Sequence, residues 1–211
     1  MFARPWLTEG DTGNWKDLID NKPFSTEFSH TRFLVPALQA HKGWALFCDS
    51  DMLFLTDIKK LFALADPKYA VLCVKHQHLP PIGVKKMDGR EQLRYHRKNW
   101  SSFMLFNCGH ESNRALTSDR VNCAKGSDMH ALNWLKDSEI GALPMTYNYI
   151  SGVSPKMDIK AVDVIHYTEG GAWFPECKEQ PYNDLWIAEH EHWSANGHDI
   201  ISPIASTAHE K

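Results

Sequence analysis

The segment 44–55 constrains the fold of this 211-residue chain more than any other. Two apolar runs, residues 44–48 and 52–55, enclose the tripeptide Asp49-Ser50-Asp51. A continuous apolar run of about five residues that ends in a polar loop is typical of a fully buried strand. Because charges flanked by buried segments need a compensating partner, the two carboxylates are expected to have a function.

Asp49 and Asp51 have the chemistry of a metal site. Two carboxylates two residues apart can offer their oxygens to one hard cation, for which Mn2+ and Mg2+ are the candidates. Taken alone, an Asp-x-Asp tripeptide is more often a turn or a helix cap. The flanking apolar runs favour the metal site, where a cation bound to a diphosphate would neutralise the charge on a departing nucleoside diphosphate.

The rest of the chain alternates between strand-like and helix-like patterns. Short apolar runs predict strands at residues 44–48, 69–74, 102–106 and 162–166, whereas helical spacing predicts helices at 25–38 (kinked or ended by Pro36), 56–64, 91–98 and 128–136. Residues 1–24 are expected to be an irregular lead with a short helix at 15–19, and residues 187–211 a C-terminal tail. This order predicts one α/β domain, residues 1–211, in which helices flank a mixed sheet with parallel pairs.

The composition excludes several classes of function. A net charge of -3 gives no electrostatic footprint for nucleic acid. No apolar stretch approaches the roughly 20 residues of a membrane span, and residues 1–14 lack the apolar centre of a signal peptide. The five cysteines form no C-x-x-C pair, and three of them lie in apolar runs, which indicates a reducing compartment. The predicted location is therefore the cytoplasm.

A second polar cluster lies between His166 and Trp173. His166 follows the apolar pair 164–165, so its imidazole is expected at a strand end, where it can complete a metal site. Gly170 and Gly171 allow consecutive backbone N–H groups to turn toward an anion such as phosphate. A lone histidine before a turn is usually structural, so this interpretation depends on the two aspartates.

The order of these motifs resembles glycosyltransferase family 8. The matching segments are STEFSHTRFLVP at 25–36, WALFCDSDML at 44–53, NWSSFMLFN at 99–107, DMHALN at 128–133, LPMTYN at 143–148 and HYTEGGAW at 166–173. The resemblance implies a GT-A fold, which is Rossmann-like, and a retaining transfer of sugar from a nucleoside-diphosphate sugar, with UDP as the expected nucleotide. The acceptor is expected to be a carbohydrate or glycan.

The resemblance also implies roles for individual residues. Asp49, Asp51 and His166 would hold Mn2+ or Mg2+ on the donor diphosphate. Arg32 and Asp128 are expected at the reacting centre. The other residues expected to bind the donor are Ser101, Ser102, Asn107, Gly170, Gly171 and Trp173, with the two glycines near phosphate and the indole as a platform for sugar.

Among several departures from the family pattern, two are prominent. Met129 stands where the family has a glutamine, so no side-chain carbonyl can assist there. Only 48 residues precede the Asp-x-Asp motif, whereas in the family a βαβ unit that binds the nucleotide base comes before it. We therefore expect the chain to lack this first unit.

Two alternative functions stay open at this stage. A sugar-phosphate nucleotidyltransferase shares the sheet and the metal chemistry, but it would carry a Gly-rich N-terminal loop with Lys or Arg, and none is visible. A non-catalytic or shortened nucleotide-sugar-binding protein is the third interpretation.

Overall fold

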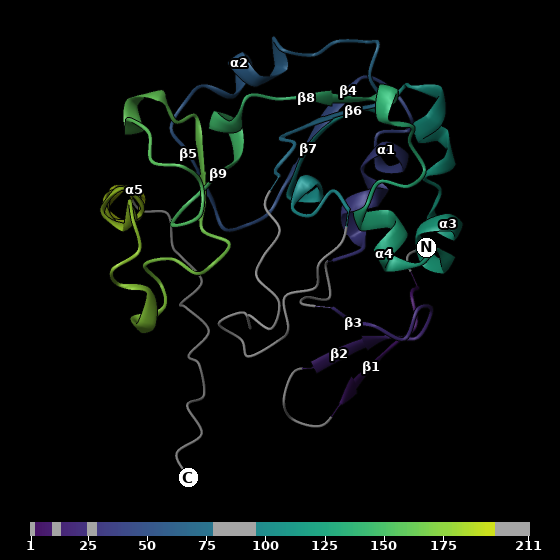
Figure 1. The fold of residues 1–211 in the computed structure, drawn as a ribbon, viewed down its shortest axis with the longest axis horizontal. Coiled ribbons are helices and arrows are strands. Elements are labelled where there is room, and N and C mark those ends of the chain that lie inside the picture. Colours follow the sequence, from purple (N-terminus) through teal and green to yellow (C-terminus); the bar gives the residue numbers. More distant parts are fainter. Residues whose placement is uncertain (1–2, 10–13, 25–28, 78–95, 197–211) are drawn as a thin grey trace.

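The computed structural model describes residues 3–9, 14–24, 29–77 and 96–196, and Figure 1 shows their arrangement. The strands are β1 (Trp6–Glu9), β2 (Asn14–Asp17), β3 (Pro23–Phe24), β4 (Trp44–Cys48), β5 (Met52–Phe54), β6 (Val71–Cys73), β7 (Phe103–Asn107), β8 (Ile140–Ala142), β9 (Tyr149–Ile150) and β10 (Val164–His166). The α-helices are α1 (Val35–Leu38), α2 (Ile58–Phe62), α3 (Ser118–Cys123), α4 (Gly126–His130) and α5 (Asn183–Ala195). Short 3-10 helices lie at Thr31–Leu34, Trp100–Ser102, Glu111–Ala115, Asp137–Glu139, Met145–Asn148, Ile159–Ala161 and Pro175–Cys177.

The central sheet has four strands in the order β4-β7-β6-β8. β7 pairs antiparallel with both β4 and β6, whereas β6 and β8 run parallel. Along β7 the side chains alternate between two apolar layers: Met104 and Phe106 pack on one face, and Phe103 and Leu105 on the other. The expectation of a mixed sheet with buried strands near 69–74 and 102–106 is confirmed.

A smaller sheet holds three strands in the order β5-β10-β9. β10 pairs antiparallel with β5 and parallel with β9. Residues 49–51 join the end of β4 in the central sheet to the start of β5 in the smaller one. The loop is held at both ends by backbone hydrogen bonds, from Asp49 N–H to Ser102 O (2.9 Å) and from Tyr167 N–H to Asp51 O (2.9 Å).

β4 differs from its prediction because all five of its residues are only half-buried. Within the described part of the chain β4 pairs with β7 alone, so it is an edge strand of the central sheet.

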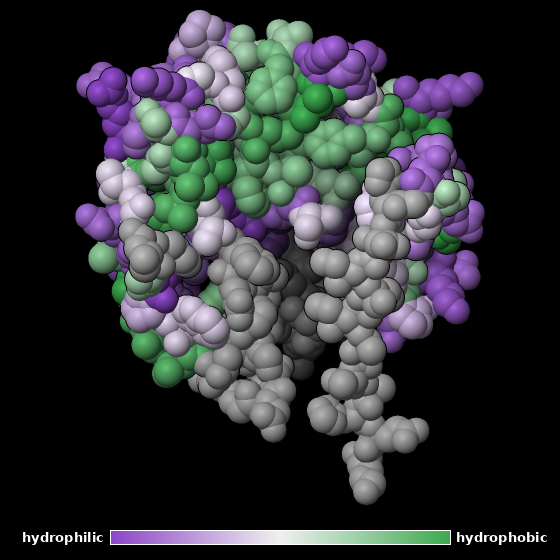
Figure 2. All heavy atoms as spheres, turned by 180° about the vertical axis from the view of Figure 1, so that it is seen from behind, coloured by the Kyte–Doolittle hydropathy of each residue, from purple (hydrophilic) through white to green (hydrophobic). Residues whose placement is uncertain are grey.

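Figure 2 shows apolar side chains gathered on the upper part of the opposite face, the region where Figure 1 places α2 and the central sheet. Large apolar side chains exposed on α1, α2 and their flanks are Leu38, Leu55, Ile58 and Leu64.

The N-terminal residues form strands where an irregular lead was expected. β1, β2 and β3 make a three-stranded antiparallel sheet, and the predicted helix at 15–19 is wrong, because residues 14–17 form β2. Buried Arg4 forms an ion pair with Asp17 and donates a hydrogen bond to the carbonyl of Val121 in α3 (2.8 Å). This long-range contact attaches the small sheet to the rest of the molecule.

The helices are shorter than their patterns predict. The predicted helix at 25–38 is a 3-10 turn from Thr31 followed by α1, whose first turn accommodates Pro36; residues 25–28 lie outside the described part. α4 ends at His130, because Leu132 adopts a left-handed conformation (φ 54°). α2, with its cap Asp57, lies within the helix predicted at 56–64, whereas the predicted helix at 91–98 falls largely on residues outside the described part.

The C-terminal region contains a helix where a tail was expected. α5 covers residues 183–195, so the part of the predicted tail that the structure describes is mostly helical. In the described residues, none of the helices has both the length and the apolar character that crossing a membrane requires.

Candidate functional site

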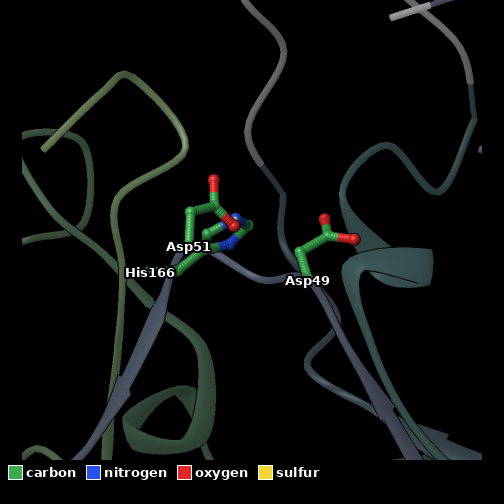
Figure 3. A group of neighbouring side chains, drawn as sticks. All are labelled: Asp49, Asp51 and His166. Carbon is green, nitrogen blue, oxygen red and sulfur yellow. The ribbon is translucent and has the colours of Figure 1, made fainter. Parts of the chain in front are cut away.

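Three potential metal ligands meet where the two sheets join. Asp49 follows β4, Asp51 precedes β5, and His166 is the last residue of β10. The antiparallel register pairs His166 with Met52, which brings the imidazole beside Asp51. One ligand atom from each residue lies within 4.8 Å of the others, and Figure 3 shows β4 and β5 diverging below these side chains.

The contact between Asp51 and His166 has the character of a cation site. Asp51 Oδ1 lies 3.2 Å from His166 Nε2, and neither buried atom has a hydrogen-bond partner among the residues that the structure describes. Two opposed lone pairs repel each other unless a proton or a cation lies between them. Carboxylate oxygen and neutral imidazole nitrogen together suit a divalent metal such as Mn2+, so the residues present fit the expected ion.

The carboxylates differ in their electrostatics. Burial raises the pKa of Asp49, and the nearby charges of Arg32 and His166 do not offset this effect. Burial also acts to raise the pKa of Asp51, but the contact with His166, and the charge of this ring when it is protonated, outweigh that effect, and the net shift is downward. Asp51 is therefore the more readily ionised ligand.

Arg32 contacts Asp49, one of the three potential ligands. Its Nη2 is 3.0 Å from Asp49 Oδ1, its Nη1 donates to the carbonyl of Ser101 (2.8 Å), and its guanidinium stacks 4.7 Å above the Phe47 ring. These contacts fix the guanidinium next to one of the potential metal ligands. Arg32 thus compensates part of the negative charge at the site.

The hydroxyl groups of Ser101 and Ser102 bond within the protein. Ser101 Oγ lies 2.9 Å from His130 Nδ1, and Ser102 Oγ donates to the carbonyl of Asn99 (2.8 Å). Both serines are buried. The structure therefore places them beside the cluster, with their hydroxyls engaged by protein atoms.

Two other expected donor residues, Asn107 and Asp128, make polar contacts with residues outside the cluster. Asn107 is at the opposite end of β7, where it pairs with Trp44 and donates to the carbonyl of Tyr69 (3.2 Å). Asp128 is exposed in the first turn of α4 and accepts a hydrogen bond from Asn133 (3.1 Å). Met129, the residue after it, is buried in the core.

Gly170 and Gly171 form a tight turn against Trp173. Gly170 has φ 102°, and its N–H donates to the carbonyl of Tyr167 (2.8 Å), so this amide is already engaged in the turn. A Cβ on Gly171 would lie 2.3 Å from the Trp173 ring. The indole also packs against Tyr167 and Trp186 and remains 37% exposed, which leaves part of its surface accessible.

We expect Gly171→Ala to lower the free energy of unfolding by about 1–3 kcal/mol, the usual cost of forcing an extra methyl group into a packed site. Thermal or denaturant unfolding measures the effect. Gly109→Ala is the matched control, because a Cβ there meets nothing closer than 3.7 Å. A loss that persists unchanged in the Trp173→Ala background would contradict a clash with the indole.

His166→Ala is expected to weaken Mn2+ binding more than Mg2+ binding, because imidazole is a good ligand for transition metals and a poor one for hard Mg2+. Titration calorimetry with each ion gives the two dissociation constants. His190→Ala on α5, an exposed histidine, serves as the control. Equal losses for both ions would show that His166 only supports the loop.

Asn148 is the site residue to which the sequence assigned no role. Its side chain is fully buried and joins His166 Nδ1 (2.9 Å) to Ser102 Oγ (2.9 Å). The LPMTYN segment that contains it was part of the family resemblance, but an asparagine at a strand end gives no signal by itself.

Comparison with known proteins gives one close curated relative. No family model matches the chain. Over 173 residues it is 45% identical to "Protein CDI" of Arabidopsis thaliana, a match that covers 81% of this chain and 66% of that protein. The chain thus spans just under two thirds of the relative's length.

Solved structures with a similar fold are glycosyltransferases. The bifunctional glycosyltransferase WbbM is matched with a TM-score of 0.54 and 17% identity, over 80% of this chain and 36% of that one. The glycosyltransferase GlyE of Streptococcus pneumoniae has a TM-score of 0.49 and 16% identity, over 85% of this chain and 49% of that one. The galactosyltransferase LgtC, solved with donor and acceptor sugar analogues, has a TM-score of 0.45 and 16% identity, over 79% of this chain and 70% of that one. Mixed sheets flanked by helices, together with the match to WbbM, give this chain a GT-A glycosyltransferase fold.

Proposed function

We propose that this chain is a metal-dependent glycosyltransferase that moves a sugar from a UDP-sugar to a carbohydrate or glycan acceptor, with retention of anomeric configuration. The observation that carries the proposal is the convergence of Asp49, Asp51 and His166, in which the buried atoms Asp51 Oδ1 and His166 Nε2 face each other at 3.2 Å. Such a set suits Mn2+, with Mg2+ as the alternative.

The protein groups around the cluster would bind and orient the donor. Asp49, Asp51 and His166 would hold the ion, which when bound neutralises negative charge on the diphosphate leaving group. Arg32, fixed between Asp49 and the Ser101 carbonyl, would keep Asp49 oriented and add positive charge near the phosphates. The exposed part of Trp173 offers an apolar face to a sugar ring.

Asp128 would contact the donor sugar from the first turn of α4. The supporting observation is its exposure beside Asn133, since an exposed carboxylate can still reorient toward a ligand. We propose the cytoplasm as the site of the reaction, because none of the five cysteines, all of them described in the structure, forms a disulfide.

The test is release of nucleoside diphosphate from a panel of nucleotide sugars, with and without Mn2+. Release from UDP-sugars that requires Mn2+ and is lost in Asp51→Asn would support the proposal. Mn2+-dependent binding of UDP without turnover would favour a nucleotide-sugar-binding protein. If no nucleotide sugar binds or reacts, the proposed function is wrong.

A further inference from the structure

We propose that Asn148 and Ser102 are positioning residues that hold His166 in one tautomer, with the proton on Nδ1 and the lone pair of Nε2 directed at the cation. This inference deepens the proposed function, because it rests on the metal site formed by Asp49, Asp51 and His166. It assigns a role to a buried chain of hydrogen bonds behind the site.

The direction of every hydrogen bond in this chain follows from one carbonyl group. The backbone oxygen of Asn99 can only accept, so the hydroxyl hydrogen of Ser102 points at it (2.8 Å). Ser102 Oγ must then accept from Asn148, and the amide atom that faces it must be the NH2 group (2.9 Å). Asn148 Oδ1 consequently faces His166 Nδ1 (2.9 Å), and this nitrogen must carry a proton.

The proton on Nδ1 decides what His166 can bind. In a neutral imidazole only one nitrogen is protonated, so Nε2 keeps its lone pair. Nε2 is the atom that lies 3.2 Å from Asp51 Oδ1, and within the described part of the chain it has no hydrogen-bond partner. In the opposite tautomer, Nε2–H would donate to Asp51, and the site would be closed to a cation.

Burial makes the arrangement difficult to reverse. Asn148 is 0% exposed, His166 1% and Ser102 6%. A flipped amide would place NH2 against the protonated Nδ1 and a carbonyl against the Ser102 oxygen, and water has little access to replace the lost bonds. The buried chain therefore selects one tautomer before any ligand arrives.

The same turn also orients the other half of the site. Asn99 has a left-handed backbone (φ 65°), which lets its carbonyl accept from both the Ser102 hydroxyl and the Ser102 amide (3.4 Å). The Ser102 carbonyl accepts from Asp49 N–H, and the Ser101 carbonyl accepts from Arg32. Residues 99–102 thus connect the backbone of one potential ligand to the imidazole of another.

The tautomer of His166 is measured directly by NMR in protein labelled with 15N-histidine. The sample contains neither metal nor donor, and its pH is one at which the ring is neutral. Two-bond 1H–15N correlations distinguish the two tautomers, and the His166 signals are those missing in His166→Gln. We expect Nδ1–H in the wild type. Asn148→Leu removes the acceptor, so it should move the proton to Nε2 and raise the Mn2+ dissociation constant about 10–100-fold.

Matched variants separate positioning from packing. Ser102→Ala removes the group that orients the amide and should give a mixture of tautomers with weaker Mn2+ binding, whereas Ser102→Thr keeps the hydroxyl and should restore both. Asn148→Asp keeps an acceptor for Nδ1–H and should preserve the wild-type tautomer. If Asn148→Leu does not fold, the Ser102 pair decides the question.

An Nε2–H signal in the wild type would overturn the inference, as would unchanged spectra and Mn2+ affinities in both Asn148→Leu and Ser102→Ala. Failure of sugar transfer bears only on the proposed function, because the spectra need neither donor nor metal. Mn2+ affinity is measured separately, by electron paramagnetic resonance of the free ion.

Discussion

Asp51→Asn is expected to lower the affinity for Mn2+ by about 100-fold or more, beyond the 10–100-fold range typical of changes behind a metal ligand. The substitution removes the charge whose Oδ1 faces His166 Nε2 and keeps the shape of the side chain. Donor-dependent release of UDP should fall with the metal affinity. Calorimetry with Mn2+, with UDP, and with both together measures the loss.

The fold should survive Asp51→Asn, because the carboxylate lies at the junction of the sheets and contributes no apolar contact to the core. Asp57→Asn is a suitable control, since Asp57 caps α2 and asparagine caps a helix equally well. A folded Asp51→Asn protein that binds Mn2+ and UDP as tightly as the wild type would eliminate the metal assignment.

Asp17→Asn is expected to lower the free energy of unfolding by about 3–5 kcal/mol, because it leaves the buried guanidinium of Arg4 without its counter-charge. Both side chains of this pair are almost fully buried, and Arg4 also holds the carbonyl of Val121. Denaturant unfolding measures the difference. The exposed Asp119→Asn on α3 should change stability little.

The contribution of the Arg4–Asp17 ion pair to the free energy of unfolding should depend on pH. Burial acts to raise the pKa of Asp17, but the hydrogen bond and charge of Arg4 outweigh it and hold the pKa below its ordinary value of 3.8. A lowered pKa in the folded state gives stability that is present above pH 3.8 and is lost as the pH falls through the folded value. The difference between wild type and Asp17→Asn should therefore shrink in acid.

The double variant Arg4→Met/Asp17→Leu tests whether the loss in Asp17→Asn comes from the uncompensated charge of Arg4. An apolar pair of similar size needs no compensation, so it should recover most of the stability lost in Asp17→Asn. Equal stability of Asp17→Asn and the wild type at neutral pH would mean that the N-terminal sheet does not depend on this ion pair.

Three strands of the central sheet, β4, β6 and β7, were predictable because their residues form short apolar runs, whereas β8 was not predicted. β6 and β7 are buried on both faces, so the run of apolar residues is continuous. β1, β2 and β3 carry no such pattern, since residues 14–17 contain a single apolar residue between polar ones. Their pairing is accompanied by the contact of Arg4 with Asp17 and α3, which no local pattern reveals.

The site was predictable only in part, for a similar reason. Asp49, Asp51 and His166 are distinctive at strand ends, and the structure brings them together. Ser101 and Ser102 were expected at the donor, and their hydroxyls contact His130 and Asn99 in the structure. Whether a buried hydroxyl faces a ligand or another side chain depends on neighbours far along the chain, such as Asn148, 46 residues from Ser102.

The seam between the two sheets has a thermodynamic consequence. Asp49 follows a strand of the central sheet, whereas Asp51 precedes and His166 ends a strand of the smaller sheet, so an ion bound by all three would connect the two sheets. By linkage, any ligand that prefers the assembled arrangement stabilises it by about 2.7 kcal/mol at a concentration of 100 times its dissociation constant. Linkage is reciprocal, because ion binding and the association of the two sheets share one coupling free energy. Substitutions in the packing between the sheets would therefore alter the affinity for the ion, even where they change none of its ligands.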